Sequence, residues 1–124
     1  MPAAPLFTDA WLAECNAALA ELPGPDAARG RLVVTELVAD APEGAHDAIT
    51  LVADHDGVRL LAGDDAAASA WLTIAMQDAE ALHAGDLDPA TALTSGRIRV
   101  RGDLRSVVEL VSVLAEAHAR LQAR

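Results

Sequence analysis

Four arginines stand close together near the C-terminal end of an otherwise acidic chain. Arg97, Arg99 and Arg101 alternate with apolar residues, and Arg105 follows shortly after them. A guanidinium group binds carboxylate or phosphate through paired hydrogen bonds, and an anionic membrane surface also attracts basic side chains. The cluster therefore predicts a site for an anionic headgroup or a contact with an anionic membrane. The alternative is a solvated strand face whose charges protect a sheet edge.

We expect no metal ion and no cofactor. The segment Asp54-His55-Asp56-Gly57 has residue types that bind metals, but Asp-Gly favours a hairpin turn and further ligands at useful spacing are missing. The single cysteine, Cys15, excludes a disulfide within the chain and a cysteine-based zinc site. Its position in the apolar stripe of a predicted helix indicates a structural thiol.

Catalytic motifs are absent from the sequence. It contains no Gly-rich phosphate loop, serine nucleophile elbow or zinc-binding helix motif. His118 and Glu109 are the polar candidates for acid–base chemistry on the last predicted helix. We therefore assign no catalytic residue.

The spacing of apolar residues predicts an α+β domain. Steps of three and four predict helices, whereas alternation and β-branched residues predict strands. Residues 66–77 fit both patterns, and the β-branched Thr73 and Ile74 favour the strand. The expected order is a helix over 9–22, strands over 31–39, 47–54, 58–62 and 66–77, short helices starting at Asp78 and Pro89, a strand over 97–101 and a long helix over 103–122.

Composition limits the class of protein. The chain has 124 residues, of which 52% are hydrophobic and 2% aromatic, and its formal charge is −10. The length predicts one domain, over residues 9–124 behind a proline-containing N-terminal tail of residues 1–8, and the charge argues against nucleic-acid binding. No apolar run reaches about 18 residues and the N-terminus does not resemble a signal peptide, so we expect a cytoplasmic protein.

The final predicted helix has an apolar face wider than one contact with a sheet requires. Such breadth indicates burial on several sides, by the core, a ligand or a partner. The residues of this face are Leu104, Val107, Val108, Leu110, Val111, Val113 and Leu114.

Residues 85–103 resemble the signature of the sterol carrier protein type 2 family. The matching features are a glycine after each of two short helices, an alternating strand, and Gly-Asp before the last helix. They fall at Gly85, Ala92-Leu93, Gly96, Ile98, Val100 and Gly102-Asp103. The element order over residues 9–122 is also similar. The resemblance implies a five-stranded, mostly antiparallel sheet with helices on one face and an apolar tunnel between them.

The resemblance also implies a function without covalent chemistry. Members of the family bind and transfer sterols, fatty acids, fatty acyl-CoA or phospholipids, so the expected ligand is a lipid or sterol-like molecule. The candidate lining comprises Leu72, Ile74, Met76, Val107, Leu110, Val111 and Leu114, with Trp11 and Trp71 as pocket caps. The alternatives are an enzyme that acts on an apolar small molecule, such as a cyclase or isomerase, and a module for homodimerisation or for binding a partner enzyme.

Overall fold

The computed structural model describes residues 4–21, 31–54 and 56–109, and its centre is a five-stranded sheet of order β3-β2-β1-β4-β5. Residues 104–109 are helical. The strands are β1 Leu32–Ala39, β2 Ala48–Asp54, β3 Gly57–Ala62, β4 Ala70–Ala75 and β5 Ile98–Gly102, and the helices are α1 Asp9–Leu19, α2 Met76–Ala84 and α3 Pro89–Thr94. The α+β prediction is confirmed.

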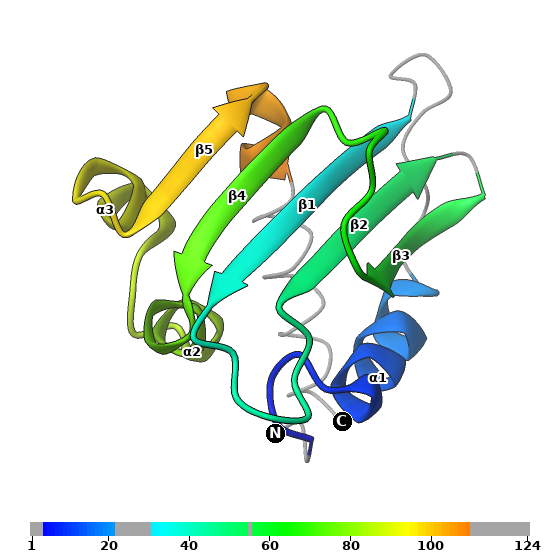
Figure 1. The fold of residues 1–124 in the computed structure, drawn as a ribbon. Helices are drawn as coiled ribbons and strands as arrows, with labels where there is room; N and C mark the ends of the chain where they lie inside the picture. Colours follow the sequence, from blue (N-terminus) through cyan, green and yellow to red (C-terminus); the bar gives the residue numbers. More distant parts are fainter. Residues whose placement is uncertain (1–3, 22–30, 55, 110–124) are drawn as a thin grey trace.

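One neighbouring pair of strands, β1 and β4, is parallel, and the other pairs are antiparallel. The chain leaves β3 at one edge and crosses one face of the sheet before it enters β4 (Figure 1). Thr50 on β2 donates a 2.7 Å hydrogen bond to the carbonyl of Gly63 in this crossing. Because that bond uses the only hydroxyl proton of Thr50, Thr35 donates the 2.8 Å bond between the two buried threonines. The crossing is thereby fixed to the two strands beneath it.

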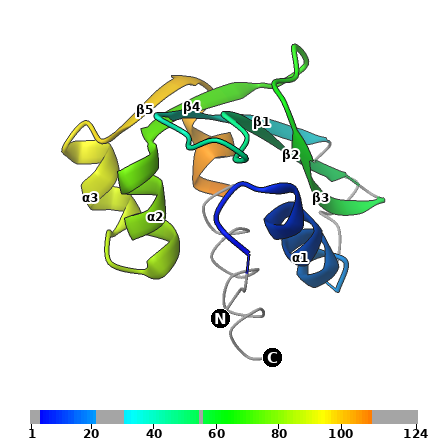
Figure 2. The same ribbon diagram turned by 60° about the horizontal axis from the view of Figure 1, so that its bottom comes forward.

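The helices lie on the opposite face of the sheet from this crossing (Figure 2). We call the face toward the helices the inner face and the other the outer face. Helix α1 packs on β3, α2 on β4 and β1, and α3 beside β5. Because side chains alternate along a strand, Val34 and Val38 of β1 join the large inner cluster, whereas Val33 joins a small outer one. The prediction of helices on one face is confirmed.

Side-chain caps begin several helices where the sequence places them. Thr8 accepts a 3.2 Å hydrogen bond from the backbone N–H of Trp11 at the start of α1. Asp88 accepts a 3.1 Å bond from the N–H of Thr91 at the start of α3. Such caps satisfy N–H groups that have no partner within the helix.

Helix α2 begins two residues earlier than predicted. Its N-cap is Ala75, which provides no side-chain bond, and Asp78 lies inside the first turn rather than at the cap. The strand β4 ends at Ala75, where its pairing with β1 also ends opposite Ala39. Met76, predicted to lie on the strand, is therefore the first helical residue, although it stays buried.

The segment before α1, predicted to be a tail, contributes a fully buried side chain. Phe7 is 0% exposed and has a left-handed backbone with φ of +66°. Its carbonyl accepts a 2.9 Å hydrogen bond from the N–H of His46, whose imidazole is paired with Asp9 at 2.6 Å. These contacts fix the entry into α1 against the loop that follows β1.

Asn16 on α1 binds the unpaired backbone edge of β3, which is an edge strand of the sheet. Its side-chain oxygen accepts a 2.7 Å hydrogen bond from the N–H of Leu60, and its side-chain nitrogen donates a 3.0 Å bond to the carbonyl of the same residue. Leu60 lies on the first strand of the sheet, so these two groups have no neighbouring strand on that side. The side-chain amide of Asn16 thus makes the two hydrogen bonds that a neighbouring strand would make, and it holds α1 against β3.

Replacement of Asn16 by alanine is expected to lower the free energy of unfolding by about 1–3 kcal/mol, because two backbone groups lose their partners. Chemical denaturation measures the change. Gln77→Ala, which removes an exposed amide from α2, should change stability by less than about 0.5 kcal/mol. Equal stability of the two variants would contradict the role assigned to Asn16.

Candidate functional site

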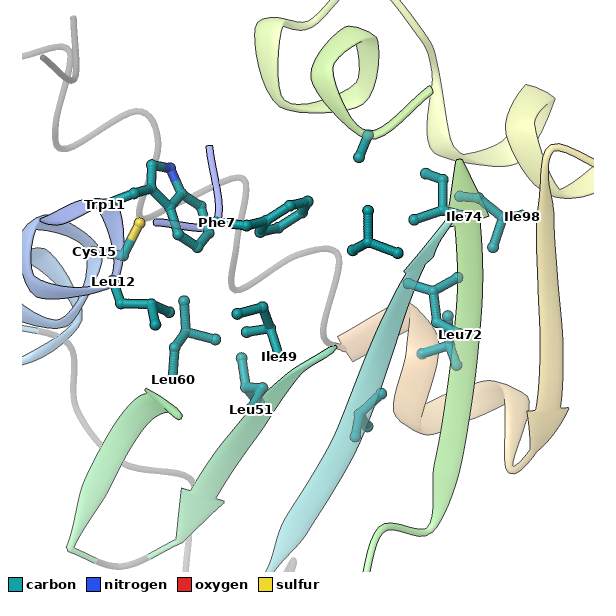
Figure 3. Packing of buried hydrophobic residues seen from close by; sticks show 14 of the residues in the cluster. Phe7, Trp11, Leu12, Cys15, Ile49, Leu51, Leu60, Leu72, Ile74 and Ile98 are labelled. Carbon is teal, nitrogen blue, oxygen red and sulfur yellow. The ribbon is translucent and has the colours of Figure 1, made fainter. Parts of the chain in front are cut away.

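The inner face of the sheet forms one continuous apolar layer from β3 to β5. Figure 3 shows side chains of α1, β2, β3, β4 and β5 converging in this layer. Of the predicted lining residues, five belong to this single cluster, namely Leu72, Ile74, Met76, Val107 and Trp11. The other three helix residues of the prediction, Leu110, Val111 and Leu114, lie outside the described residues.

Trp71 points to the other side of the sheet. It follows the buried Ala70 and precedes the buried Leu72, and it packs with the outer-face residues Val33 and Val52. Its indole nitrogen donates a 3.0 Å hydrogen bond to Asp64 in the crossing segment. Because adjacent strand residues face opposite sides, Trp71 does not share a surface with Leu72 and Ile74.

The arginine cluster also lies away from the apolar layer. Arg99 and Arg101 alternate with the inward-facing Ile98, and all four arginines of the cluster are exposed. The guanidinium of Arg101 lies over the ring of Trp71, 4.6 Å from its centre, in a cation–π contact. The sheet therefore separates Arg99 and Arg101 from the apolar layer.

The first turn of the last helix is tied to the sheet by a polar network. Asp103 accepts hydrogen bonds from the N–H of Arg105 (3.2 Å) and the hydroxyl of Ser106 (2.9 Å), which confirms the predicted cap. The hydroxyl of Ser106 is also 3.1 Å from that of Ser69, which precedes β4. Val107 is thereby held against the inner face, where it is fully buried.

The broad apolar face predicted for this helix is only partly buried in its described turns. Leu104 and Val108 are 54% and 53% exposed, although Val107 between them is covered. Two exposed apolar residues four positions apart lie on the same side of a helix. This part of the face is thus available to a partner or to a membrane.

Glu36 is a buried ionisable residue that the sequence analysis did not select. It lies on β1 between Val34 and Val38, opposite Ile49 on β2 and Leu72 on β4, so it belongs to the inner face. It is 3% exposed, and no hydrogen-bond partner for its Oε1 atom is found in the described part of the chain. In the sequence, Glu36 stands two residues from Val34 and two from Val38, so strand alternation puts it on the same face as these valines.

Burial raises the pKa of the Glu36 carboxyl from 4.5 to about 7. Removal from water penalises the charged form of a carboxyl, and the four neighbours just named are apolar. At neutral pH a substantial share of the folded molecules therefore carries this carboxyl protonated, as a hydrogen-bond donor as well as an acceptor.

The pKa shift makes the stability of the protein depend on pH. The unfolded chain loses the Glu36 proton near pH 4.5 and the folded chain near pH 7, so the free energy of unfolding should fall as pH rises through this range. At about 1.4 kcal/mol per unit of pKa, this loss amounts to about 3 kcal/mol. Glu36→Gln should lack it.

Urea denaturation at pH 4.5, 6 and 8 measures this effect. The control is Glu80→Gln, which removes an exposed carboxyl from α2 and should retain the pH dependence of the wild-type protein. Parallel stability curves for the wild-type protein and Glu36→Gln would refute the assignment.

Three aromatic rings join the N-terminal segment, α1 and α2 at one end of the apolar layer. The ring centres of Phe7 and Trp11 are 5.2 Å apart, and the ring of His83 lies 5.8 Å from Phe7 and 5.7 Å from Trp11. All three pairs meet edge to face, the arrangement that aromatic quadrupoles favour. Trp11 therefore packs against aromatic rings within the core.

Cys15 and Asp54 have structural roles. Burial, with the adjacent Glu14, raises the pKa of the Cys15 thiol to about 12, so this group stays protonated. Asp54 forms a paired ion bridge with Arg59, with distances of 3.2 and 3.1 Å, and accepts a 3.0 Å bond from the N–H of Asp56 in the hairpin turn. His118 lies outside the described residues.

Metal-binding clusters and membrane-spanning helices are both absent from the part of the chain that the structure describes. No group of three potential metal ligands occurs among residues 4–21, 31–54 and 56–109. In the same ranges, none of the helices has the length and apolar character needed to cross a membrane.

Similar folds occur in solved structures. UbiJ-SCP2, a ubiquinone synthesis protein, has a TM-score of 0.62 at 22% identity, and the match covers 96% of this chain and 97% of that one. Sterol carrier protein 2 from Yarrowia lipolytica has a TM-score of 0.60 at 12% identity, with coverages of 95% and 98%. The sec-alkylsulfatase Pisa1 from Pseudomonas sp. has a TM-score of 0.60 at 15% identity. This chain spans only 16% of the length of that enzyme, while the match covers 85% of this chain. These likenesses show a shared fold.

The sequence itself matches a family model. Residues 26–115 match the model described as the SCP-2 sterol transfer family. No match was found among curated protein sequences. Since the family model matches most of the chain, this chain belongs to the SCP-2 sterol transfer family.

Proposed function

We propose that this chain binds a hydrophobic ligand in an apolar cavity between the inner face of the sheet and the helices, and transfers it without covalent chemistry. The ligand class is a sterol, a fatty acid, a fatty acyl-CoA or a related lipid. The observation that carries the proposal is the apolar inner layer in a chain of the SCP-2 family. Burial of apolar surface contributes roughly 25 cal/mol per Å², so a lipid chain enclosed there would bind through its area.

Ligand binding can be tested on the purified protein. Native mass spectrometry of freshly purified protein should detect a co-purifying hydrophobic molecule, and delipidated protein should take up a fluorescent fatty acid or sterol. Protein that is empty after purification and binds no member of a broad lipid panel would refute the proposal.

A matched pair of variants tests the location of the ligand. Ile74→Phe adds bulk to the inner face of β4, whereas Thr73→Phe adds the same ring to the exposed outer face of the same strand. The inner variant should bind the fluorescent lipid about tenfold less tightly and the outer variant as tightly as wild type, with both folded by circular dichroism. Equal binding by both variants would place the ligand elsewhere.

We also propose that the protein contacts an anionic membrane while it exchanges its ligand. Arg99 and Arg101 lie on the outer face of β5, and the exposed Leu104 and Val108 flank the exposed Arg105. Basic side chains are attracted to anionic headgroups, and exposed apolar side chains favour the headgroup region of a bilayer. This arrangement supports a membrane contact over a headgroup site for an enclosed lipid, because the sheet lies between Arg99 or Arg101 and the inner face.

Vesicle sedimentation tests the membrane contact. The protein should bind vesicles of phosphatidylserine and phosphatidylcholine at low salt, and it should be released as salt is raised. Vesicles of phosphatidylcholine alone should bind less, and Arg99→Gln with Arg105→Gln should weaken binding to the mixed vesicles. Absence of binding to mixed vesicles at low salt would refute the contact.

A further inference from the structure

Glu36 is a buried polar side chain at the centre of the apolar layer. The strand β1 is the middle strand of the sheet, and Glu36 pairs in register with Ile49 on one side and Leu72 on the other. Both neighbours are inner-face core residues, as are Val34 and Val38 along the strand. The carboxyl is therefore far from both sheet edges and has apolar side chains on all four sides within the sheet.

Such a placement is costly for the fold. A buried polar atom without a hydrogen bond destabilises a protein, and native structures rarely retain one without a reason. The Oε1 atom of Glu36 has no such bond in the described part of the chain. A leucine at this position would fill a similar volume without that cost. The destabilisation has a physical use if a bound molecule supplies the missing hydrogen-bond partner.

We propose that Glu36 is the polar anchor of the ligand site, and that the ligand is a hydrophobic molecule with a hydrogen-bond donor, an alcohol or an amine. This inference rests on the proposed function and narrows its ligand class. A carboxylate or a protonated carboxyl both accept a hydrogen bond from O–H or N–H through Oε1. A ligand with only acceptors leaves an ionised Glu36 without a partner. A fatty acid carboxylate also brings a second negative charge near it.

Two matched ligands isolate the donor. Dodecan-1-ol and its methyl ether share the alkyl chain and the oxygen, but only the alcohol has a hydroxyl proton. At pH 9, where Glu36 is ionised and cannot donate to the ether oxygen, delipidated wild-type protein should bind the alcohol about tenfold more tightly than the ether, because a hydrogen bond to a buried charged group contributes about that factor. Displacement of a fluorescent lipid measures both affinities. The preference for the alcohol is due to Glu36 only if variants at this position change the ratio of the two affinities.

Three variants make that assignment. Glu36→Leu should bind alcohol and ether with equal affinity, because it offers no acceptor. Glu36→Gln should show a smaller preference for the alcohol than the wild-type protein, because its amide NH2 can donate to the ether oxygen. It should also lose any preference for dodecylamine over dodecan-1-ol that the wild-type protein shows. The control Glu80→Leu removes a negative charge from the exposed surface of α2 and should behave as wild type.

The outcomes separate the two proposals. If alcohol and ether bind equally to the wild-type protein and to Glu36→Leu, the anchor is refuted while lipid binding stands. If neither molecule binds and the lipid panel also fails, the proposed function is refuted and the anchor with it. Since Glu36→Leu removes a buried carboxyl, we expect it to fold, and Glu36→Gln gives a second, nearly isosteric test.

Discussion

Replacement of Phe7 by alanine is expected to lower the free energy of unfolding by about 3–5 kcal/mol, the usual cost of removing a buried aromatic ring. Phe7 is fully buried, and its ring contacts those of Trp11 and His83 edge to face. In Figure 3 it lies between the α1 side chains and Ile74 on β4. Its removal would therefore leave a void inside the apolar layer.

Urea denaturation measures this loss, and Phe7→Leu is the control. Leucine keeps most of the apolar volume and the same left-handed backbone, so its cost should be much smaller, about 1–2 kcal/mol. A small apolar molecule such as benzene should raise the melting temperature of Phe7→Ala more than that of wild type, because it fills the new void. A loss below about 1 kcal/mol for Phe7→Ala would mean that the ring is dispensable.

Gly102→Ala is expected to have the second large effect, a loss of about 2–5 kcal/mol. Gly102 has φ of +97°, a conformation that costs an L-residue about 1–2 kcal/mol. In addition, a Cβ atom there would lie 2.4 Å from the carbonyl oxygen of Ser69 and 2.9 Å from the Cα atom of Ala70. Both contacts are with backbone, so β4 and β5 would have to separate, at a further cost typical of overpacking.

Gly96→Ala is the matched control for Gly102→Ala. Gly96 also has a positive φ, +79°, but a Cβ atom there would meet no atom within 4 Å. Its cost should be that of backbone strain alone, about 1–2 kcal/mol. Thermal denaturation measures both losses of stability. If Gly102→Ala and Gly96→Ala lose the same free energy of unfolding, the close approach of Gly102 to Ser69 does not add to the cost of a side chain at position 102.

Much of the fold could be predicted because its signals are local. Thr8, Asp88 and Asp103 each bond N–H groups within three residues of themselves, and the Asp-Gly hairpin joins neighbouring strands. The strand over 70–75 was also predicted, within a longer range. The predicted start of α2 was wrong. The strand β4 ends at Ala75, where its pairing with β1 ends, and this pairing joins distant parts of the chain.

The candidate site was predictable only in part for the same reason. Leu72 and Ile74 follow from alternation, but Trp71 was grouped with them although it is adjacent to Leu72 and so faces the other side. Glu36 was missed because the inner face of β1 becomes defined only when β2 and β4 pair on either side of it. Alternation alone puts Glu36 on the same face as Val34 and Val38, but the burial of that face depends on the long-range contacts.

The bond from Asn16 to strand β3 bears on how copies of this chain could associate. A second molecule that continued the sheet beyond β3 would need the N–H and carbonyl groups of Leu60, and Asn16 already occupies both. Helix α1 precedes β3 in the chain, so this amide is available to the strand as soon as the strand emerges during synthesis. Asn16 therefore opposes association by strand addition at this position of β3, and loss of Asn16 should favour fibrous self-assembly along the β3 side.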